Sequence, residues 1–469
     1  MEKYNKAFKA YDIRGIFGED IDAYFCFIMG YATGQDLIEK HGAKASILIS
    51  SDTRKINKDL INKYIIGLTQ AGIKYLDSVQ ASANADYPYG ITSSSAAYHI
   101  GQNNRNMTAI FTASHNPAEY VGIKCFDKNA ALASTAHLQE IFIQSYKFRE
   151  NKTIPNETKL FTSNKDIVEK KIQEYYNVIQ KKRSQLQKNH KFVVDFSHGA
   201  AVSFEKTFYE TYANNHLVAM INDYPDGTFP AHEWDTGEAH NYKQLIQEVQ
   251  NQWAEFGIMF DWDADRIWVV TSTGEIIPGD ILYAIIAKQI LQNTIDKNPI
   301  MLYDCMSSKI VAETIKKYGG TPQIARVWRF FINRNMIQSW ALAGWEVSGH
   351  YMFGALWCVE SVLIAQYYLM KELESYNDME SMIRQYKKYY KWPVQNVVVH
   401  SKEKVLEKIK NTFSEYKQEN LDGISIYTDT YWFNVRASNT ENKIRFTVEA
   451  DNKETRETIV YKLQSVINK

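Results

Sequence analysis

The sequence predicts an α/β protein of several domains, and three observations lead to this class. Apolar runs of strand length alternate with amphipathic stretches of helix length, which is typical of layered α/β folds. The chain has 469 residues, too many for a single hydrophobic core, and the usual domain size suggests about three or four units. Apolar residues make up 45% of the chain and charged residues 23%, which is an ordinary globular composition.

The first unit is expected to hold three strands and a helix. Buried strands are predicted at 45–50, 73–76 and 107–111, and a helix is predicted at 57–71, ending near Gly72. The last of these strands leads directly into the polar turn TASHNP at 112–117. The segment 127–163 is polar and irregular, so a linker is expected there.

The second unit is expected to begin with a helix. Ser163 stands three residues before Asp166, which resembles a capping box. The apolar residues that then keep one helical face are Ile167, Val168, Ile172, Tyr175, Tyr176 and Ile179. Strands are predicted at 191–195, 256–260 and 267–270.

The third unit is expected to contain a strand at 299–303 and helices over roughly 307–318 and 359–374. The charged, Tyr-rich stretch 376–392 is expected to be a connecting helix. The last unit is expected to have strands at 395–400, 424–428 and 444–450, a polar loop at 436–443 and a closing helix. The first three units share a strand–helix–strand order, which suggests an internal repeat.

Charge and hydropathy exclude several functional classes. Lysine plus arginine equals aspartate plus glutamate, 54 against 54, so nothing favours a nucleic-acid or anionic membrane partner. The N-terminus does not resemble a signal peptide, and no apolar run approaches the roughly 20 residues of a membrane-spanning helix. The four cysteines, Cys26, Cys125, Cys305 and Cys358, lack CxxC spacing and are expected to be packed thiols. A cytoplasmic protein, monomeric or homodimeric, is expected.

Three carboxylates alternate in the motif DWDADR, just after the predicted strand 256–260. Asp261, Asp263 and Asp265 would share one face of an extended chain, so their charges can converge on one point. Converging like charges need a cation, and oxygen-only ligands suit a hard ion such as Mg²⁺. The alternative is a solvated acidic loop, because such triplets are common by chance.

The turn TASHNP places Ser114 at the exit of a predicted strand, with His115 beside it. A hydroxyl in this position can act as a nucleophile or carry a phosphoryl group. The alternative is an ordinary turn rich in Ser, Asn and Pro.

Two further loops have residues suited to a phosphorylated sugar. RASNTENKIR gathers guanidiniums, hydroxyls and loop N–H groups, which a phosphate dianion needs; the alternative is a polar hairpin. Its candidate ligands are Arg436, Ser438, Asn439, Thr440 and Arg445. In GWEVSGH, Glu346, Ser348 and His350 follow a short apolar run. A carboxylate and a hydroxyl there can bind sugar hydroxyls, although such residues also occur on any exposed turn.

The order of these motifs along the chain resembles that of the α-D-phosphohexomutase family, which includes phosphomannomutase/phosphoglucomutase. The match runs from about Lys9 to Ala450. It comprises KAYDIRG, SDTR, TASHNPAEYVGIK, DYPDGTFPAHE, the aspartate triplet, GWEVSGH and RASNTE. The probability that all of these motifs occur by chance in the order of the family is very small.

The resemblance implies four domains around a central cleft: three similar α/β domains with mixed sheets and a smaller α+β C-terminal domain. Their expected bounds are 1–152, 153–271, 272–375 and 376–469. Each domain would supply one loop to the cleft. The implied activity is interconversion of hexose 1-phosphate and hexose 6-phosphate, of mannose or glucose. It would pass through a phosphoserine and a hexose 1,6-bisphosphate, and it would require Mg²⁺.

The resemblance also implies a role for each matching residue. Ser114 would be the phosphoserine and a ligand of Mg²⁺, together with the three aspartates. Arg14, Lys124 and Arg266, with His115, would lie at the reacting phosphate. Glu346, Ser348 and His350 would bind the sugar, and the residues of RASNTE would bind the phosphate that does not react. Arg329 stands where many relatives carry His, so it is expected to bind substrate but does not inherit an acid/base role.

Several positions that are usually Gly in this family are Trp in this chain. The clearest are Trp253, Trp262, Trp268, Trp328 and Trp345, and less secure ones are Trp234, Trp340, Trp357 and Trp392. Only Trp432 fits a Trp of the family. Glycine is 22 of 469 residues, below the roughly 7% that is typical. We hypothesise that the nine codons are UGA and are read as glycine in the source organism. The alternative is an inactive homologue, with real tryptophans, that still binds phosphosugars or a partner.

Two other enzyme classes fit the sequence less well. Phosphoglucosamine mutase is disfavoured by Asn439, where that relative usually has Gly, and by Val347. A haloacid-type phosphatase would need a nucleophilic Asp in a DxD motif after its first strand, and the sequence has none there.

Overall fold

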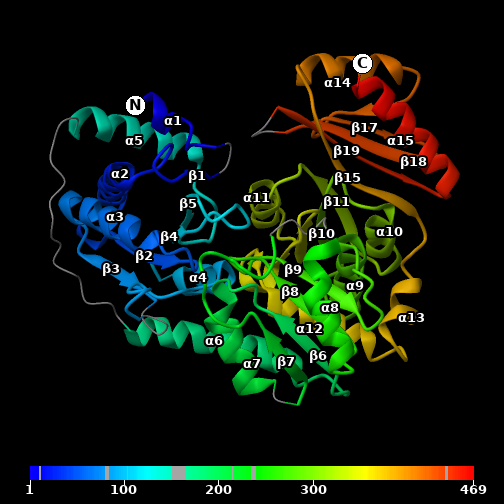
Figure 1. Ribbon diagram of the computed structural model, residues 1–469, viewed down its shortest axis with the longest axis horizontal. Coiled ribbons are helices and arrows are strands. Elements are labelled where there is room, and N and C mark those ends of the chain that lie inside the picture. The colour runs from blue at the N-terminus through cyan, green and yellow to red at the C-terminus, as the bar shows by residue number, and fades with distance from the viewer. Residues whose placement is uncertain are drawn as a thin grey trace. The chain divides into compact units, whose positions relative to one another are not determined.

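The computed structural model describes residues 1–9, 12–79, 84–102, 104–149, 165–213, 215–233, 239–438 and 442–468 (Figure 1). The chain divides into two compact units. Unit 1 comprises Met1–Glu275 and Val359–Tyr367, and unit 2 comprises Ile276–Cys358 and Tyr368–Lys469. Each unit contains two β-sheets.

The first sheet of unit 1 has the strand order β1-β5-β4-β2-β3. Its strands are β1 (Ile13–Ile16), β2 (Ser46–Ser51), β3 (Tyr75–Ser78), β4 (Met107–Phe111) and β5 (Tyr120–Asp127). β2, β3 and β4 are parallel, whereas β5 is antiparallel to β4 and β1 is antiparallel to β5. All residues of β2 and β4 are buried, which explains why each strand contains a run of consecutive apolar residues.

Five helices accompany this sheet: α1 (Glu2–Asn5), α2 (Ala23–His41), α3 (Asn57–Ala71), α4 (Ser94–Gly101) and α5 (Thr135–Arg149). Asp22 caps α2, because its side chain accepts a hydrogen bond from the N–H of Phe25 at 2.8 Å. The linker predicted at 127–163 is wrong where α5 forms, since Leu138 and Phe142 of this polar helix are buried in the core. Ser163, the predicted helix cap, lies outside the described residues.

The second sheet of unit 1 has the order β7-β6-β8-β9. Its strands are β6 (Phe192–Asp195), β7 (Leu217–Ile221), β8 (Phe256–Phe260) and β9 (Ile267–Thr271). Its helices are α6 (Lys165–Arg183), the 3₁₀ turn η3 (Ala200–Val202), α7 (Phe204–Tyr212), η4 (Ala239–Tyr242) and α8 (Lys243–Asn251). β6, β7 and β8 are parallel, and β9 returns antiparallel to β8.

A short later segment, Val359–Tyr367, belongs to unit 1. It contains β14 (Val359–Glu360) and the first part of α12 (Val362–Leu373). Its hydrogen bonds to α6 and α7 join Tyr175 to Ser361 at 2.9 Å and Tyr209 to Gln366 at 2.8 Å. These buried side-chain contacts attach the segment to unit 1.

The third sheet, in unit 2, has β11, β10, β12 and β13 as successive neighbours. Their bounds are β10 (Ile300–Asp304), β11 (Thr321–Ala325), β12 (Ala343–Glu346) and β13 (His350–Phe353). The helices are α9 (Gly279–Gln292), α10 (Lys309–Lys317), α11 (Arg329–Ser339), η5 (Gly354–Leu356) and α13 (Met379–Arg384). β10, β11 and β12 are parallel, and β13 is antiparallel to β12.

The fourth sheet is antiparallel and has the order β15-β19-β18-β17-β16. Its strands are β15 (Tyr390–Val398), β16 (Gln418–Glu419), β17 (Ile424–Tyr427), β18 (Tyr431–Ala437) and β19 (Lys443–Ala450). The helices α14 (Lys402–Thr412) and α15 (Lys453–Ile467) pack side by side on this sheet (Figure 1). The connecting helix predicted at 376–392 is wrong beyond α13, because β15 already begins at Tyr390.

The first three sheets share one topology. In each, three parallel strands stand in the order second, first, third, and an antiparallel fourth strand follows the third. The hairpins that join the third strand to the fourth lie at 112–119, 261–266 and 347–349. These hairpins contain or adjoin the motifs of Ser114, of the aspartates and of Glu346, so the repeat places them equivalently. The predicted four-domain α/β class with mixed sheets is confirmed.

Among the described residues, no helix combines the length and the apolar character required to cross a membrane. The four cysteines are buried free thiols.

Candidate active site

Ser114 lies in the hairpin between β4 and β5, and only 2% of its surface is exposed. Its backbone is left-handed, with φ of 52°, and its N–H donates to Oγ1 of Thr112 at 2.8 Å. Its Oγ donates to Oδ2 of Asp261 at 3.3 Å and also contacts the guanidinium of Arg266. The hydroxyl is therefore held between a carboxylate and a guanidinium.

Arg54 holds the serine loop in place. Its side chain is 1% exposed and forms an ion pair with Asp52 at 3.1 Å. Its guanidinium donates to the backbone oxygens of Ser114 at 3.0 Å, Asn116 at 2.6 Å, Pro117 at 2.7 Å and Tyr120 at 3.1 Å. In the sequence, Arg54 was recognised only as part of the motif SDTR. Its hydrogen bonds to the serine loop were not predictable, because that loop lies about 60 residues away along the chain.

The three aspartates of the second hairpin converge, as predicted. Asp261, Asp263 and Asp265 are 5%, 0% and 1% exposed, and one carboxylate oxygen of each lies within 4.8 Å of the others. The predicted reason, an extended chain, is wrong. The loop is a tight turn in which Oδ1 of Asp261 accepts the N–H groups of Asp265 and Arg266, both at 3.1 Å, and Ala264 has a φ of 53°.

Two basic side chains compensate these carboxylates. Nζ of Lys124 lies 2.6 Å from Oδ2 of Asp263 and 2.9 Å from Oδ2 of Asp265. Nε of Arg266 lies 2.8 Å from Oδ2 of Asp261. Burial and the neighbouring carboxylates raise the pKa of Asp261 well above its usual value, despite Arg266. Burial and Asp265 act in the same direction on Asp263, but the charge and hydrogen bond of Lys124, together with Arg266, lower the pKa of Asp263.

The donor set fits a hard divalent cation. All three ligands are carboxylates, and Oδ1 of Asp263 is buried without a hydrogen-bond partner among the described residues. Such an orphaned oxygen is costly unless a cation or water satisfies it. The prediction that the three aspartates form an acidic triad able to bind a metal ion is thereby confirmed.

A serine-rich helix start supports the metal loop from the first sheet. Oγ of Ser94 donates to Oδ2 of Asp263 at 2.8 Å, and the N–H of Ser94 donates to the Asp263 carbonyl at 2.7 Å. Oγ of Ser95 donates to the Ala264 carbonyl at 2.9 Å. Oγ of Ser93 donates to Oε1 of Glu205 at 2.7 Å. Sequence reasoning missed these residues; the run TSSS at 92–95, buried throughout, was the available signal.

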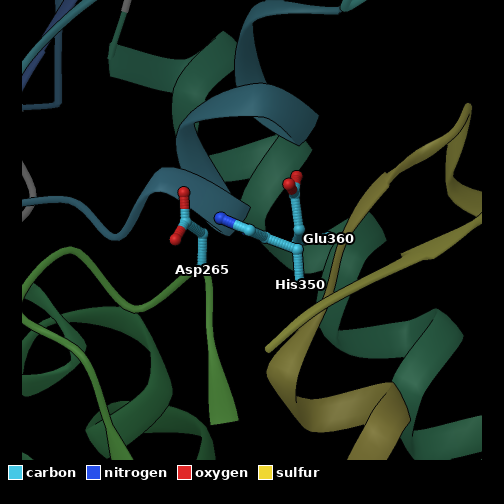
Figure 2. A group of neighbouring side chains, drawn as sticks. All are labelled: Asp265, His350 and Glu360. Carbon is cyan, nitrogen blue, oxygen red and sulfur yellow. The ribbon is translucent and has the colours of Figure 1, made fainter. Parts of the chain in front are cut away.

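Glu360 was also missed as a neighbour of the triad. A carboxylate oxygen of this fully buried residue lies within 4.8 Å of one of Asp265. Figure 2 shows both side chains. The other basic candidates lie nearby. Arg14 donates to Oδ1 of Asn116 at 2.6 Å and pairs with Asp12 at 2.6 Å. Burial, then Arg266 and Arg14, hold the pKa of His115 well below its usual value, so its imidazole is neutral.

In unit 2, the third hairpin carries the predicted sugar-binding residues. Glu346 ends β12 and is 5% exposed, and the hydroxyl of Ser348 donates to its carboxylate. His350, labelled in Figure 2, begins β13, and Arg329 begins α11; both are buried. Asp304, which sequence reasoning missed, accepts the N–H of Val347 at 2.6 Å and fixes the hairpin from the end of β10.

The fourth sheet carries the predicted phosphate-binding residues in the hairpin between β18 and β19. Arg436 is 2% exposed, and its Nε and Nη1 are buried without a hydrogen-bond partner among the described residues, although Nη1 lies 3.7 Å from Asp422. Ser438 is 1% exposed. Arg445 faces Arg436 in the register and donates to Asn396 at 3.0 Å. Asn439 and Thr440 lie outside the described residues.

A buried serine hydroxyl beside a carboxylate triad and two cations, within a four-domain α/β fold, defines an enzyme of phosphoryl transfer. Models of the phosphoglucomutase/phosphomannomutase family match almost the whole chain. Its α/β/α domains I, II and III match residues 5–152, 170–274 and 278–389, and its C-terminal domain matches residues 395–463. The chain belongs to the phosphoglucomutase/phosphomannomutase family.

Individual relatives agree. The chain is 36% identical over 465 residues to a phosphomannomutase of Methanocaldococcus jannaschii, covering 98% of this chain and 97% of that protein. It is 27% identical to a phosphomannomutase/phosphoglucomutase of Pseudomonas aeruginosa, covering 96% and 93%. The crystal structure of a phosphoglucomutase/phosphomannomutase family protein from Burkholderia thailandensis superposes with a TM-score of 0.83, covering 98% and 96% at 21% identity. The predicted family is confirmed, and the alternative of a phosphoglucosamine mutase is not favoured.

Proposed function

We propose that the chain is a Mg²⁺-dependent phosphohexomutase that interconverts the 1- and 6-phosphates of mannose and of glucose. Ser114 would carry the phosphoryl group, and a hexose 1,6-bisphosphate would be the intermediate. The observation that carries the proposal is the placement of the Ser114 hydroxyl 3.3 Å from Asp261, with Arg266 in contact on the same oxygen. Relatives named phosphomannomutase and phosphoglucomutase support both sugars as substrates.

The residues of unit 1 have separable roles in this proposal. In the forward half-reaction, the P–O bond at Ser114 would break and a new P–O bond would form on the free sugar hydroxyl. The proton of that hydroxyl would end on Oγ of Ser114, which leaves as the free serine hydroxyl. Lys124 and Arg266 would neutralise the negative charge on the transferring phosphoryl group. A Mg²⁺ ion held by Asp261, Asp263 and Asp265 would supply further charge neutralisation. Arg14 and Arg54 would orient the serine loop.

The residues of unit 2 would bind the remainder of the substrate. Glu346 and Ser348 present a carboxylate and a hydroxyl, which suit sugar hydroxyls, and His350 and Arg329 would assist in binding the substrate. Among the described residues, the buried Nε and Nη1 of Arg436 have no hydrogen-bond partner, and such donors suit a phosphate dianion. Ser438, Asn439, Thr440 and Arg445 would complete that phosphate site. We also propose that the four domains span residues 1–152, 153–271, 272–375 and 376–469.

The test is transfer of labelled phosphate from a hexose 1,6-bisphosphate to the protein. With Mg²⁺ present, we expect the label on the peptide that contains Ser114, and none with excess chelator. The Ser114→Ala variant should take no label and should lose turnover of mannose and glucose 1-phosphates. Label on another residue, or no label with Mg²⁺, would refute the phosphoserine mechanism.

A further inference from the structure

Two helices end in a glycine whose backbone is left-handed. Gly72 follows α3 with a φ of 104°, and Gly319 follows α10 with a φ of 82°. In each case the next N–H reaches back five residues to a helix carbonyl. These bonds join Ile73 to Leu68 at 3.1 Å and Gly320 to Ile315 at 2.8 Å. This is the Schellman cap, in which the left-handed residue is usually glycine because a Cβ is unfavourable there.

Two other helices end in the same cap with tryptophan in the glycine position. Trp253 follows α8 with a φ of 52°, and Trp340 follows α11 with a φ of 56°. The five-residue bonds join Ala254 to Val249 at 3.0 Å and Ala341 to Met336 at 3.2 Å. Both indoles project into solvent, with exposures of 90% and 88%, so burial of the ring does not offset the backbone strain.

Two further tryptophans also have a positive φ. Trp328, just before α11, has φ of 112° and ψ of 128°, a combination outside the regions open to residues with a side chain. Trp357 ends the 3₁₀ turn η5 in the left-handed region, with φ of 64°, and is 56% exposed. Tryptophan is 10 of 469 residues, yet it supplies four of the twelve non-glycine residues with positive φ in the described part of the chain, where a proportional share would be fewer than one.

Trp432 shows how a tryptophan that belongs to its position is held. It is the second residue of β18, is 1% exposed, and its Nε1 donates to Oε1 of Glu449 at 2.7 Å. Trp262, in the metal loop, is 4% exposed and stacks on Phe229, yet its Nε1 is buried without a hydrogen-bond partner among the described residues. Trp345 is better held, because its Nε1 donates to Oγ of Ser307 at 2.6 Å.

We infer that positions 253, 328, 340 and 357 carry glycine in the protein that the source cell makes, and that their codons are UGA read as glycine. One codon reassignment acts at every site of that codon, so the five other positions hypothesised above to be UGA (234, 262, 268, 345 and 392) would carry glycine as well, whereas Trp432 would be encoded by UGG. Glycine at 262 and 345 would then stand beside Asp261 and Glu346. The inference rests on backbone geometry and does not depend on the proposed activity.

The first experiment reads the codons of the gene at the ten tryptophan positions. We expect UGA at the four positions with positive φ and UGG at position 432. UGG at positions 253, 328, 340 and 357 would overturn the inference.

The second experiment measures the midpoint of thermal unfolding for the full chain with Trp253→Gly and Trp340→Gly. Both indoles are exposed, so their removal costs little burial. We expect the double glycine variant to melt several degrees higher than the parent chain, because glycine tolerates positive φ. The matched control is the double alanine variant, which also removes the indoles but keeps a Cβ, so it should gain clearly less.

Two further outcomes test whether the backbone requires glycine at these positions. Trp432→Gly should lower the unfolding midpoint, because it removes a buried ring and its hydrogen bond. If the alanine pair stabilises the chain as much as the glycine pair, or if neither raises the midpoint, the backbone does not require glycine and the inference fails.

Discussion

Ser94 binds Asp263 through two hydrogen bonds: Oγ to Oδ2 at 2.8 Å, and the N–H to the carbonyl oxygen at 2.7 Å. Ser94 begins α4 beside the first sheet, whereas Asp263 belongs to the hairpin of the second. Ser94 therefore fixes the central carboxylate of the triad in both position and orientation. Partners of this kind commonly matter nearly as much as the metal ligands.

The first prediction follows from that contact. Ser94→Ala should weaken the apparent affinity for Mg²⁺ by about 10- to 100-fold, the usual effect of removing a partner of a metal ligand. The measurement is activation of the mutase reaction as a function of Mg²⁺ concentration. Ser46→Ala is the control, because its Oγ lies 3.0 Å from Oδ1 of Asn106 at the far end of β2. Equal Mg²⁺ dependence in the two variants would argue against this role of Ser94.

The second prediction concerns Arg54, which donates to three backbone oxygens of the hairpin 112–119 and to that of Tyr120, the first residue of β5. Lysine keeps the charge but has a single donor atom, so Arg54→Lys should misplace the Ser114 hydroxyl. We expect kcat to fall by about 100-fold, since small displacements of reacting groups cost this much. Arg105→Lys is the control, because Arg105 is a partly buried arginine that bonds Asn104 rather than the serine loop. A kcat for Arg54→Lys close to that of the control would contradict the prediction.

The strands and motifs were predictable from sequence where the signal is local. β2, β4 and β8 are short apolar runs bounded by polar turns, and the three aspartates stand within five residues. Residues that act across the fold were not predictable in this way. Ser94 and Asp263 are 169 residues apart, and the sequence around either residue does not indicate that the other is its hydrogen-bond partner.

The prediction of helices was wrong where the polar composition of a segment does not reflect how deeply its apolar residues are buried. α5 has the polar composition of a linker, yet Leu138 and Phe142 pack into the core of the first sheet, so tertiary contacts make it a helix. The left-handed backbone at Trp253 and Trp340 was not visible in the sequence itself, because φ depends on how each helix ends.

The third prediction concerns Asp304, a fully buried carboxylate at the end of β10. It accepts the N–H groups of Val347 at 2.6 Å and Met306 at 2.8 Å, so it holds the hairpin that carries Glu346 and Ser348. Asp304→Ala would leave the buried N–H of Val347 without its acceptor, at a cost of about 1–3 kcal/mol.

If the hairpin binds the sugar, this cost should appear as a KM for hexose phosphate raised by about 10-fold, with a smaller change in kcat. Asp304→Asn keeps an acceptor oxygen and should fall between the parent chain and the alanine variant. Asp296→Asn, on the surface of the same unit, should leave both constants unchanged. An alanine variant that folds normally and keeps its KM would exclude this positioning role.

The fourth prediction is a pH dependence of stability that originates at Glu205. This residue is fully buried on α7; its Oε1 accepts from Ser93, and its Oε2 has no hydrogen-bond partner among the described residues. Burial raises the pKa of Glu205 from 4.5 to about 7, against the hydrogen bond from Ser93. The folded state therefore binds this proton more tightly than the unfolded state does.

Because the folded pKa lies above the unfolded one, the contribution of Glu205 to stability is complete below about pH 4.5 and is lost as the pH rises through 7. The loss amounts to about 3 kcal/mol, taking each pKa unit as about 1.4 kcal/mol. Glu205→Gln is neutral at every pH, so its free energy of unfolding relative to the parent chain should increase between pH 5 and pH 8. Urea unfolding at several pH values measures this difference. Glu210→Gln, an exposed carboxylate on the same helix, should show no such trend, and a parallel pH profile for parent and Glu205→Gln would mean that Glu205 is ionised in the folded state.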